Sequence, residues 1–200
     1  ALGAAVLQGF AAEGLRFPVA GTEGPGVLTG LLTRVTRAGK GEPVALAVEA
    51  ALSDQKALEL IECGFSPLVG QAGLGQAYFL AAPSARAVAR YDSEEATTAS
   101  FRSATLPYQL FASMAAQALA RAARQCGSGL GEDGVRSRIQ AAMLDFLASA
   151  EPTTVSEEVD VEIIGSPDSA HLLDVAVRLR PMFPIYGGPA DLVLGTQALR

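Results

Sequence analysis

Two segments near the C-terminus alternate apolar and polar residues with a period of two. In residues 159–164, valine and isoleucine alternate with aspartate and glutamate, and in residues 172–180, leucine and valine alternate with aspartate, alanine and arginine. This period is typical of strands that bury one face and expose the other. A turn-rich stretch at 165–170 joins them, and a Gly-Gly-Pro turn at 187–189 precedes a third candidate strand at 190–198. The pattern predicts an antiparallel β-ribbon at the C-terminus.

The charges of the two strands favour one register of this ribbon. Pairing Val161 with Val177 brings opposite charges together, whereas a shift by two residues places Glu162 opposite Asp174. The favourable pairs are Asp160 with Arg178 and Glu158 with Arg180. Two uses remain open: the ribbon closes the subunit's own core, or it also accepts strands from neighbouring subunits, because exposed strand edges carry unpaired backbone groups.

The rest of the chain predicts an α+β body with a mixed sheet and packed helices. The chain has 200 residues, 50% of them hydrophobic, which is enough for one substantial core. We therefore expect a body at residues 1–156 and C-terminal strands at 157–200 that serve core closure and an inter-subunit sheet. Helices are expected at 1–12, 53–64, 92–103, 108–125 and 135–147, an irregular loop at 16–26, and short strands at 44–48, 67–69 and 77–80. Ser53 and Asp92 are the expected N-caps of the second and third helices. The last helix carries one apolar stripe, made of Val135, Ile139, Met143, Phe146 and Leu147.

Charge and hydropathy exclude some classes of partner. The formal net charge is −6 and the basic residues are dispersed, so we expect no nucleic-acid binding. No apolar run approaches the ~20 residues of a membrane span, and no signal segment opens the chain. A cytoplasmic protein is expected. The chain begins inside a predicted helix without methionine, which suggests a piece of a longer polypeptide.

Residues that commonly carry chemistry are sparse, so we assign no catalytic, cofactor-binding or metal-binding residue and expect no enzyme. Ser166, Asp168, Ser169 and His171 lie too close together in one turn to surround a substrate as a catalytic triad does. The glycine-rich run at 21–26 lacks the Gly-Lys-Ser/Thr ending of a phosphate-binding loop. One histidine and two distant cysteines do not match zinc spacing.

Cys63 and Cys126 each stand just before a glycine, at the end of a predicted helix. A helix C-terminus disfavours a thiolate. Both are therefore expected to be ordinary small core residues rather than reactive thiols.

Five short motifs occur in an order that resembles one known family. They are the glycine-rich run at 21–26 preceded by Arg16, Gly-Phe-Ser-Pro-Leu-Val at 64–69, Tyr-Asp at 91–92 with Ala-Thr at 96–97, Leu-Pro-Tyr at 106–108, and Leu-Arg-Pro at 179–181. Together they resemble the C-terminal part of the large subunit of the type VI secretion contractile sheath, the TssC/VipB family. The resemblance extends over nearly the whole chain.

The resemblance implies a structural protein of the bacterial cytoplasm. Family members pair with a small sheath subunit (TssB/VipA-like) and with copies of themselves in a helical tube, which surrounds an inner-tube protein and contracts to drive it outward. An unfoldase then dismantles the contracted tube. Carried over by position, the inter-subunit strand contacts would be Val159, Asp160, Val161, Ile163, Val175, Val177, Arg178, Leu179 and Arg180.

Two other functions remain open. A non-polymerising adaptor or baseplate-type protein could share the fold, and electron microscopy with candidate partners would separate it from a sheath subunit. An enzyme with carboxylate chemistry would need a deep pocket in which Asp and Glu side chains converge.

Overall fold

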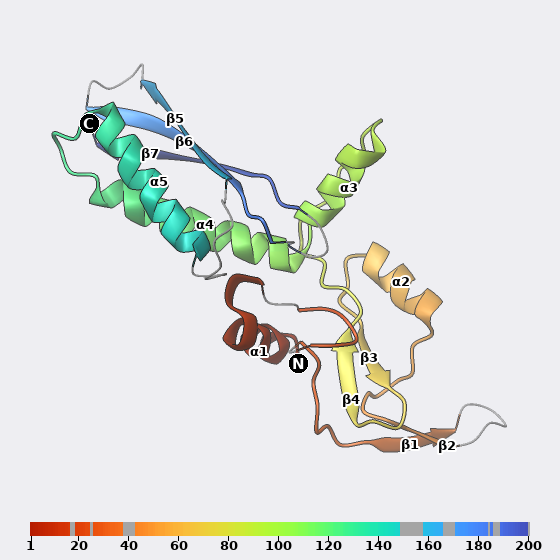
Figure 1. Cartoon of the computed structure of the whole chain (residues 1–200). Helices are drawn as coiled ribbons and strands as arrows, with labels where there is room; N and C mark the ends of the chain where they lie inside the picture. The colour runs from red at the N-terminus through yellow and green to blue at the C-terminus, as the bar shows by residue number, and fades with distance from the viewer. Residues whose placement is uncertain are drawn as a thin grey trace. The chain divides into compact units, whose positions relative to one another are not determined.

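The computed structural model describes residues 1–16, 19–24, 26–37, 43–148, 158–165, 171–183, 185 and 189–199. The chain is of the α+β class, as the sequence predicts (Figure 1). Its described strands pair into antiparallel sheets, so the expectation of a mixed sheet is wrong. The chain divides into two compact units, Ala1–Gln109 and Leu110–Arg200.

The first unit consists of short helices and two antiparallel hairpins. Strand β1 has no counterpart among the expected elements, because its Arg-Val-Thr-Arg sequence is short and only partly apolar. The other elements lie close to the expected segments. The bounds are α1 (Leu2–Glu13), a 3₁₀ turn η1 (Gly14–Arg16), β1 (Arg34–Arg37), β2 (Pro43–Leu46), α2 (Asp54–Glu62), β3 (Leu68–Gln71), β4 (Gln76–Phe79) and α3 (Glu94–Ser103).

The loop that follows α1 runs beside strand β4. Leu28 and Ala77 exchange backbone hydrogen bonds of 2.8 and 3.0 Å, and the Gly21 amide donates to the Phe79 carbonyl at 2.9 Å. The buried side chains of Ala5, Leu28 and Phe79 form a small core here. These bonds satisfy backbone groups in a segment that has no regular secondary structure of its own.

Two helix caps differ in how well the sequence predicts them. Ser53 caps α2 as expected, its hydroxyl accepting from the Lys56 amide at 3.4 Å. The expected cap of α3, Asp92, is wrong, because Ser93 has the extended cap conformation and accepts from the Ala96 amide at 3.4 Å. Serine and aspartate are nearly equivalent caps, so adjacent candidates leave the helix start open by one residue.

Of the two cysteine predictions, one is confirmed and the other is wrong. Cys126 is buried as expected, and burial raises the pKa of its thiol while the positive charge of Arg138 opposes the rise. Cys63 is exposed, so its assignment to the core is wrong. It caps the C-terminus of the short helix α2, where only Ala57 is buried, so this helix buries too little surface to cover its last turn.

The second unit holds most of α4 (Leu106–Gln125), α5 (Glu132–Ala148) and the strands β5 (Glu158–Gly165), β6 (Leu172–Arg180) and β7 (Leu192–Leu199). The C-terminal strands share this unit with α5 and with most of α4. The ring of Phe111 on α4 lies 6.0 Å from those of both Phe146 and Phe183, measured between centroids. Helix α5 buries four of the five residues of its predicted stripe, and Phe146 is half-buried. The four are Val135, Ile139, Met143 and Leu147.

The C-terminal strands form an antiparallel sheet in the order β5-β6-β7. The register predicted from charge is confirmed, with Val161 opposite Val177 and Asp160 opposite Arg178. The third candidate strand is confirmed as β7, which pairs with the other edge of β6. Helices α4 and α5 lie against one face of this sheet (Figure 1), so the opposite face is the outer one.

Candidate assembly interface

The middle strand of the C-terminal sheet has a partner on each side. β6 pairs with β5 along one edge and with β7 along the other. Among the described residues, the sheet therefore ends at the outer edges of β5 and β7. A strand from another chain can extend this sheet only at one of those two edges while the three strands stay paired.

The structure brings the nine predicted contact residues together in one sheet, on two different faces. Asp160 and Arg178 are exposed on the outer face, and Arg180 is half-buried there. The apolar members point to the helix side and belong to the core of this unit, Ile163 only in part. They are Val159, Val161, Ile163, Val175, Val177 and Leu179. Of these six, only Val159, Val161 and Ile163 lie on an outer strand, so only they could contact another subunit through backbone groups.

The two arginines of β6 converge on a carboxylate of the same chain. Arg178 donates from Nε to Asp191 Oδ1 at 2.7 Å and from Nη2 to Oδ2 at 2.5 Å, and Arg180 Nε lies 3.5 Å from the same Oδ2. Asp191 immediately precedes β7, so this cluster ties the end of β6 to the start of β7. The hydrogen bond from Arg178 is the main cause that holds the pKa of Asp191 below its usual range, against a smaller opposing effect of burial.

The sequence places Asp160 opposite Arg178, and the structure agrees on that backbone register, but the bidentate ion pair of Arg178 goes to Asp191. Asp191 is absent from the predicted site. The sequence does contain a signal for Asp191. This residue is acidic and directly precedes a candidate strand without charges, and the preceding strand carries Arg178 and Arg180.

The two outer strands differ in charge. β5 carries Glu158, Asp160 and Glu162, whereas β7, with the sequence Leu-Val-Leu-Gly-Thr-Gln-Ala-Leu, carries no charged residue. On β7, Val193 is 65% exposed and Leu199 is 49% exposed. Charged residues and proline on an edge strand discourage pairing with other chains, and β7 has neither. Its edge is therefore the better acceptor of an added strand, although no residue of β7 is among the nine predicted contacts.

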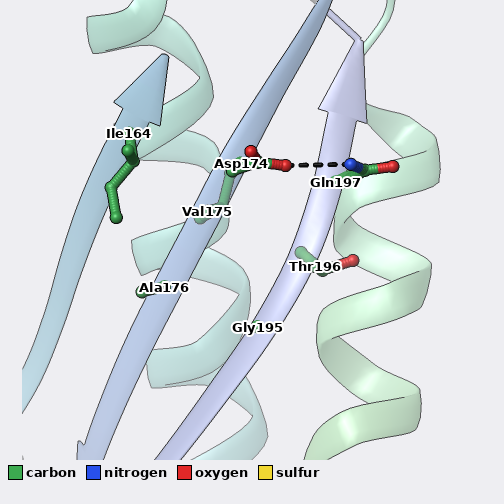
Figure 2. A pocket seen from close by; sticks show the side chains of 7 residues that line it. All are labelled: Ile164, Asp174, Val175, Ala176, Gly195, Thr196 and Gln197. Carbon is green, nitrogen blue, oxygen red and sulfur yellow. Dashed lines mark hydrogen bonds between the residues drawn. The ribbon is translucent and has the colours of Figure 1, made fainter. Parts of the chain in front are cut away.

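A hollow of about 420 Å³ opens on the outer face of the sheet (Figure 2). Ala176 on β6 and Gly195 on β7 lie opposite each other and leave the space unfilled. Beside them, Gln197 Nε2 donates to Asp174 Oδ1 at 2.9 Å. Ile164, Val175 and Thr196 complete the lining.

The other sequence candidates do not gather into a site in the described part of the chain. Ser166, Asp168 and Ser169 lie outside the described residues, and His171 is an exposed residue immediately before β6. A search of the described residues for three or more His, Cys, Asp or Glu side chains arranged to hold a metal found no such group. None of the described helices has the length and apolar character needed to cross a bilayer.

Comparison of the chain with protein-family models and with curated proteins found no match.

Proposed function

We propose that this chain is part of the large subunit of a bacterial contractile secretion sheath, a structural and non-enzymatic protein of the cytoplasm. In this proposal it assembles with a small sheath subunit and with copies of itself into a helical tube around an inner-tube protein. An unfoldase would later recycle the contracted tube. The order of five sequence motifs supports the family, and the uncharged edge of β7, which pairs with no further strand in the described part of the chain, supports the mode of assembly.

The edge of β7 is the observation that carries this proposal. A strand added there would gain backbone hydrogen bonds along the eight residues from Leu192 to Leu199. Such bonds run in the plane of the sheet and fix the direction of the added strand. Two subunits joined in this way can rotate relative to each other as bodies while the shared strands stay paired, which is what a contracting tube requires.

The side chains of β6 suit a strand that carries load. Val177 and Leu179 are fully buried, and Val175 is nearly so. The middle strand is thus anchored both by its two ladders and by its apolar side chains. Force that arrives at an outer strand would pass into the helix-packed core of the unit rather than into a loop.

A pair of proline variants on β7 tests the proposal. Successive residues of an edge strand point their amides alternately toward the neighbouring strand and away from it. Proline at one of Thr196 and Gln197 therefore removes a hydrogen bond to β6, and proline at the other removes an amide that faces outward. Only the variant whose proline replaces the outward-facing amide is expected to fold normally, because edge strands tolerate proline where the amide faces solvent.

The folded proline variant is then mixed with a candidate small sheath subunit, and assembly is followed by sedimentation and negative-stain imaging. We expect the unmodified chain to form tubes and the folded variant to remain unassembled. Tubes of normal appearance from that variant would contradict strand addition at β7. Discrete particles without tubes from the unmodified chain would favour the adaptor function instead.

A further inference from the structure

Gly195 occupies a position where the fold does not require glycine. It lies within β7, its φ is not positive, and a Cβ placed on it would meet nothing within 4 Å. Glycine inside a strand lowers stability by roughly 0.5–1 kcal/mol relative to alanine, because it loses more conformational freedom on folding. In strands, such a residue often marks a place where another molecule approaches closely.

The hollow on the outer face of the sheet, called the notch below, lies over Gly195 and Ala176. Ala176 lies opposite Gly195 on β6, so two neighbouring strands present almost no side chain at the same level. Asp174 and Arg178 stand on either side of Ala176 on the same face, and at about 3.3 Å per residue their Cα atoms lie roughly 13 Å apart. Ile164 and Val193 add exposed apolar surface at the two ends of this notch.

The charges around the notch indicate which charge its binding partner should carry. Asp160 and Glu162 on β5 are exposed on this face, and in the described part of the chain neither has an ion-pair partner. Asp174 is bound to the neutral Gln197, while the two arginines of the face are held by Asp191. The carboxylates therefore attract cationic groups, and a second copy of this chain, with its net charge of −6, is a poor match.

We propose that the notch over Ala176 and Gly195 docks a segment of a different protein that presents one large apolar side chain beside a lysine or arginine. The apolar side chain fills the notch, and the basic side chain reaches Glu162 or Asp174. Anchors of this kind, one bulky group in a pocket with charges at its rim, supply most of the binding energy of many interfaces. Because the notch lies on the face of the sheet and not at its edge, docking there does not depend on the proposed strand pairing.

A fluorescent peptide tests this proposal directly. The chain contains no tryptophan, so the emission of a short peptide with one tryptophan between two pairs of lysines reports binding without a tryptophan background. The control peptide carries glutamates in place of the lysines. We expect saturable binding of the lysine peptide and much weaker binding of the glutamate peptide.

Variants that fill the notch complete the test. Gly195→Val is expected to weaken binding of the lysine peptide at least about tenfold while its urea midpoint stays equal to or above that of the unmodified chain. Ala176→Leu fills the same space from the neighbouring strand and serves if Gly195→Val folds poorly. Gly127→Val, at a glycine of the same unit where a Cβ would also meet nothing within 4 Å, is the matched control and should bind normally. Absence of saturable binding, equal binding of both peptides, or normal binding by both notch-filling variants would overturn the proposal.

Discussion

Asp191→Asn is expected to destabilise the second unit at neutral pH, with an effect that disappears in acid. The substitution keeps the shape of the side chain and removes the charge on which Arg178 and Arg180 converge. Because the folded pKa of Asp191 is lowered, its contribution to stability is present above the unfolded pKa, about 3.9. This contribution is lost as the pH falls through the pKa that Asp191 has in the folded protein.

The magnitude follows from geometry and exposure. A bidentate pair with donor distances of 2.7 and 2.5 Å is at the strong end of ion pairs. The side chains of Arg178 and Asp191 are nevertheless 47% and 45% exposed, so solvent screens the attraction. We therefore expect a loss of about 0.5 to 1 kcal/mol in the free energy of unfolding, near the upper limit for exposed pairs.

Urea unfolding at low ionic strength, followed from about pH 7 down to a pH below both the folded and the unfolded pKa of Asp191, measures this difference. The matched control is Asp160→Asn, which lies directly opposite Arg178 across the ladder. It should change stability by less than about 0.5 kcal/mol, as most exposed substitutions do. A control loss equal to that of Asp191→Asn, or a difference between Asp191→Asn and the unmodified chain that persists below both pKa values, would refute the assigned pairing.

Three further outcomes follow from packing. Phe111→Ala should cost about 3–5 kcal/mol of stability in urea unfolding, because this fully buried ring contacts two others. Gly70→Ala should cost about 1–3 kcal/mol, since its Cβ would lie 2.8 Å from Val48 Cγ2, and adding Val48→Ala should restore part of the loss. Iodoacetamide should modify exposed Cys63 quickly and buried Cys126 only on unfolding, as mass spectrometry would show; equal rates would contradict the burial of Cys126.

The alternating strands and the striped helix were predictable because a single period decides which face is buried. In the sheet, the charges of β5 and β6 also predicted the register, because a shift by two residues would place the carboxylates of Glu162 and Asp174 opposite each other. In α5, the positions of Val135, Ile139, Met143 and Leu147 repeat at helical spacing, and all four are buried.

Other features depend on tertiary contacts that local patterns do not contain. The ion pair of Arg178 with Asp191 forms only because β7 returns along β6, and no periodicity links those two residues. Strand β1 is four residues long and forms by pairing with β2. The hollow at Gly195 likewise arises because two small residues, Ala176 and Gly195, lie opposite each other. Their pairing follows from the register between β6 and β7 and not from the sequence of either strand alone.

The arginine cluster also determines where the outer strand would begin to detach under tension. Arg178 and Arg180 bind Asp191 at the N-terminal end of β7, whereas near its C-terminal end the described side-chain tie is a single hydrogen bond from the uncharged Gln197 to Asp174. Peeling therefore starts more readily at Leu199 and advances toward the clamp. A pull that peels the C-terminal end away would break the ladder bond by bond, while the same pull on the other end would first have to break the ion pairs of Asp191.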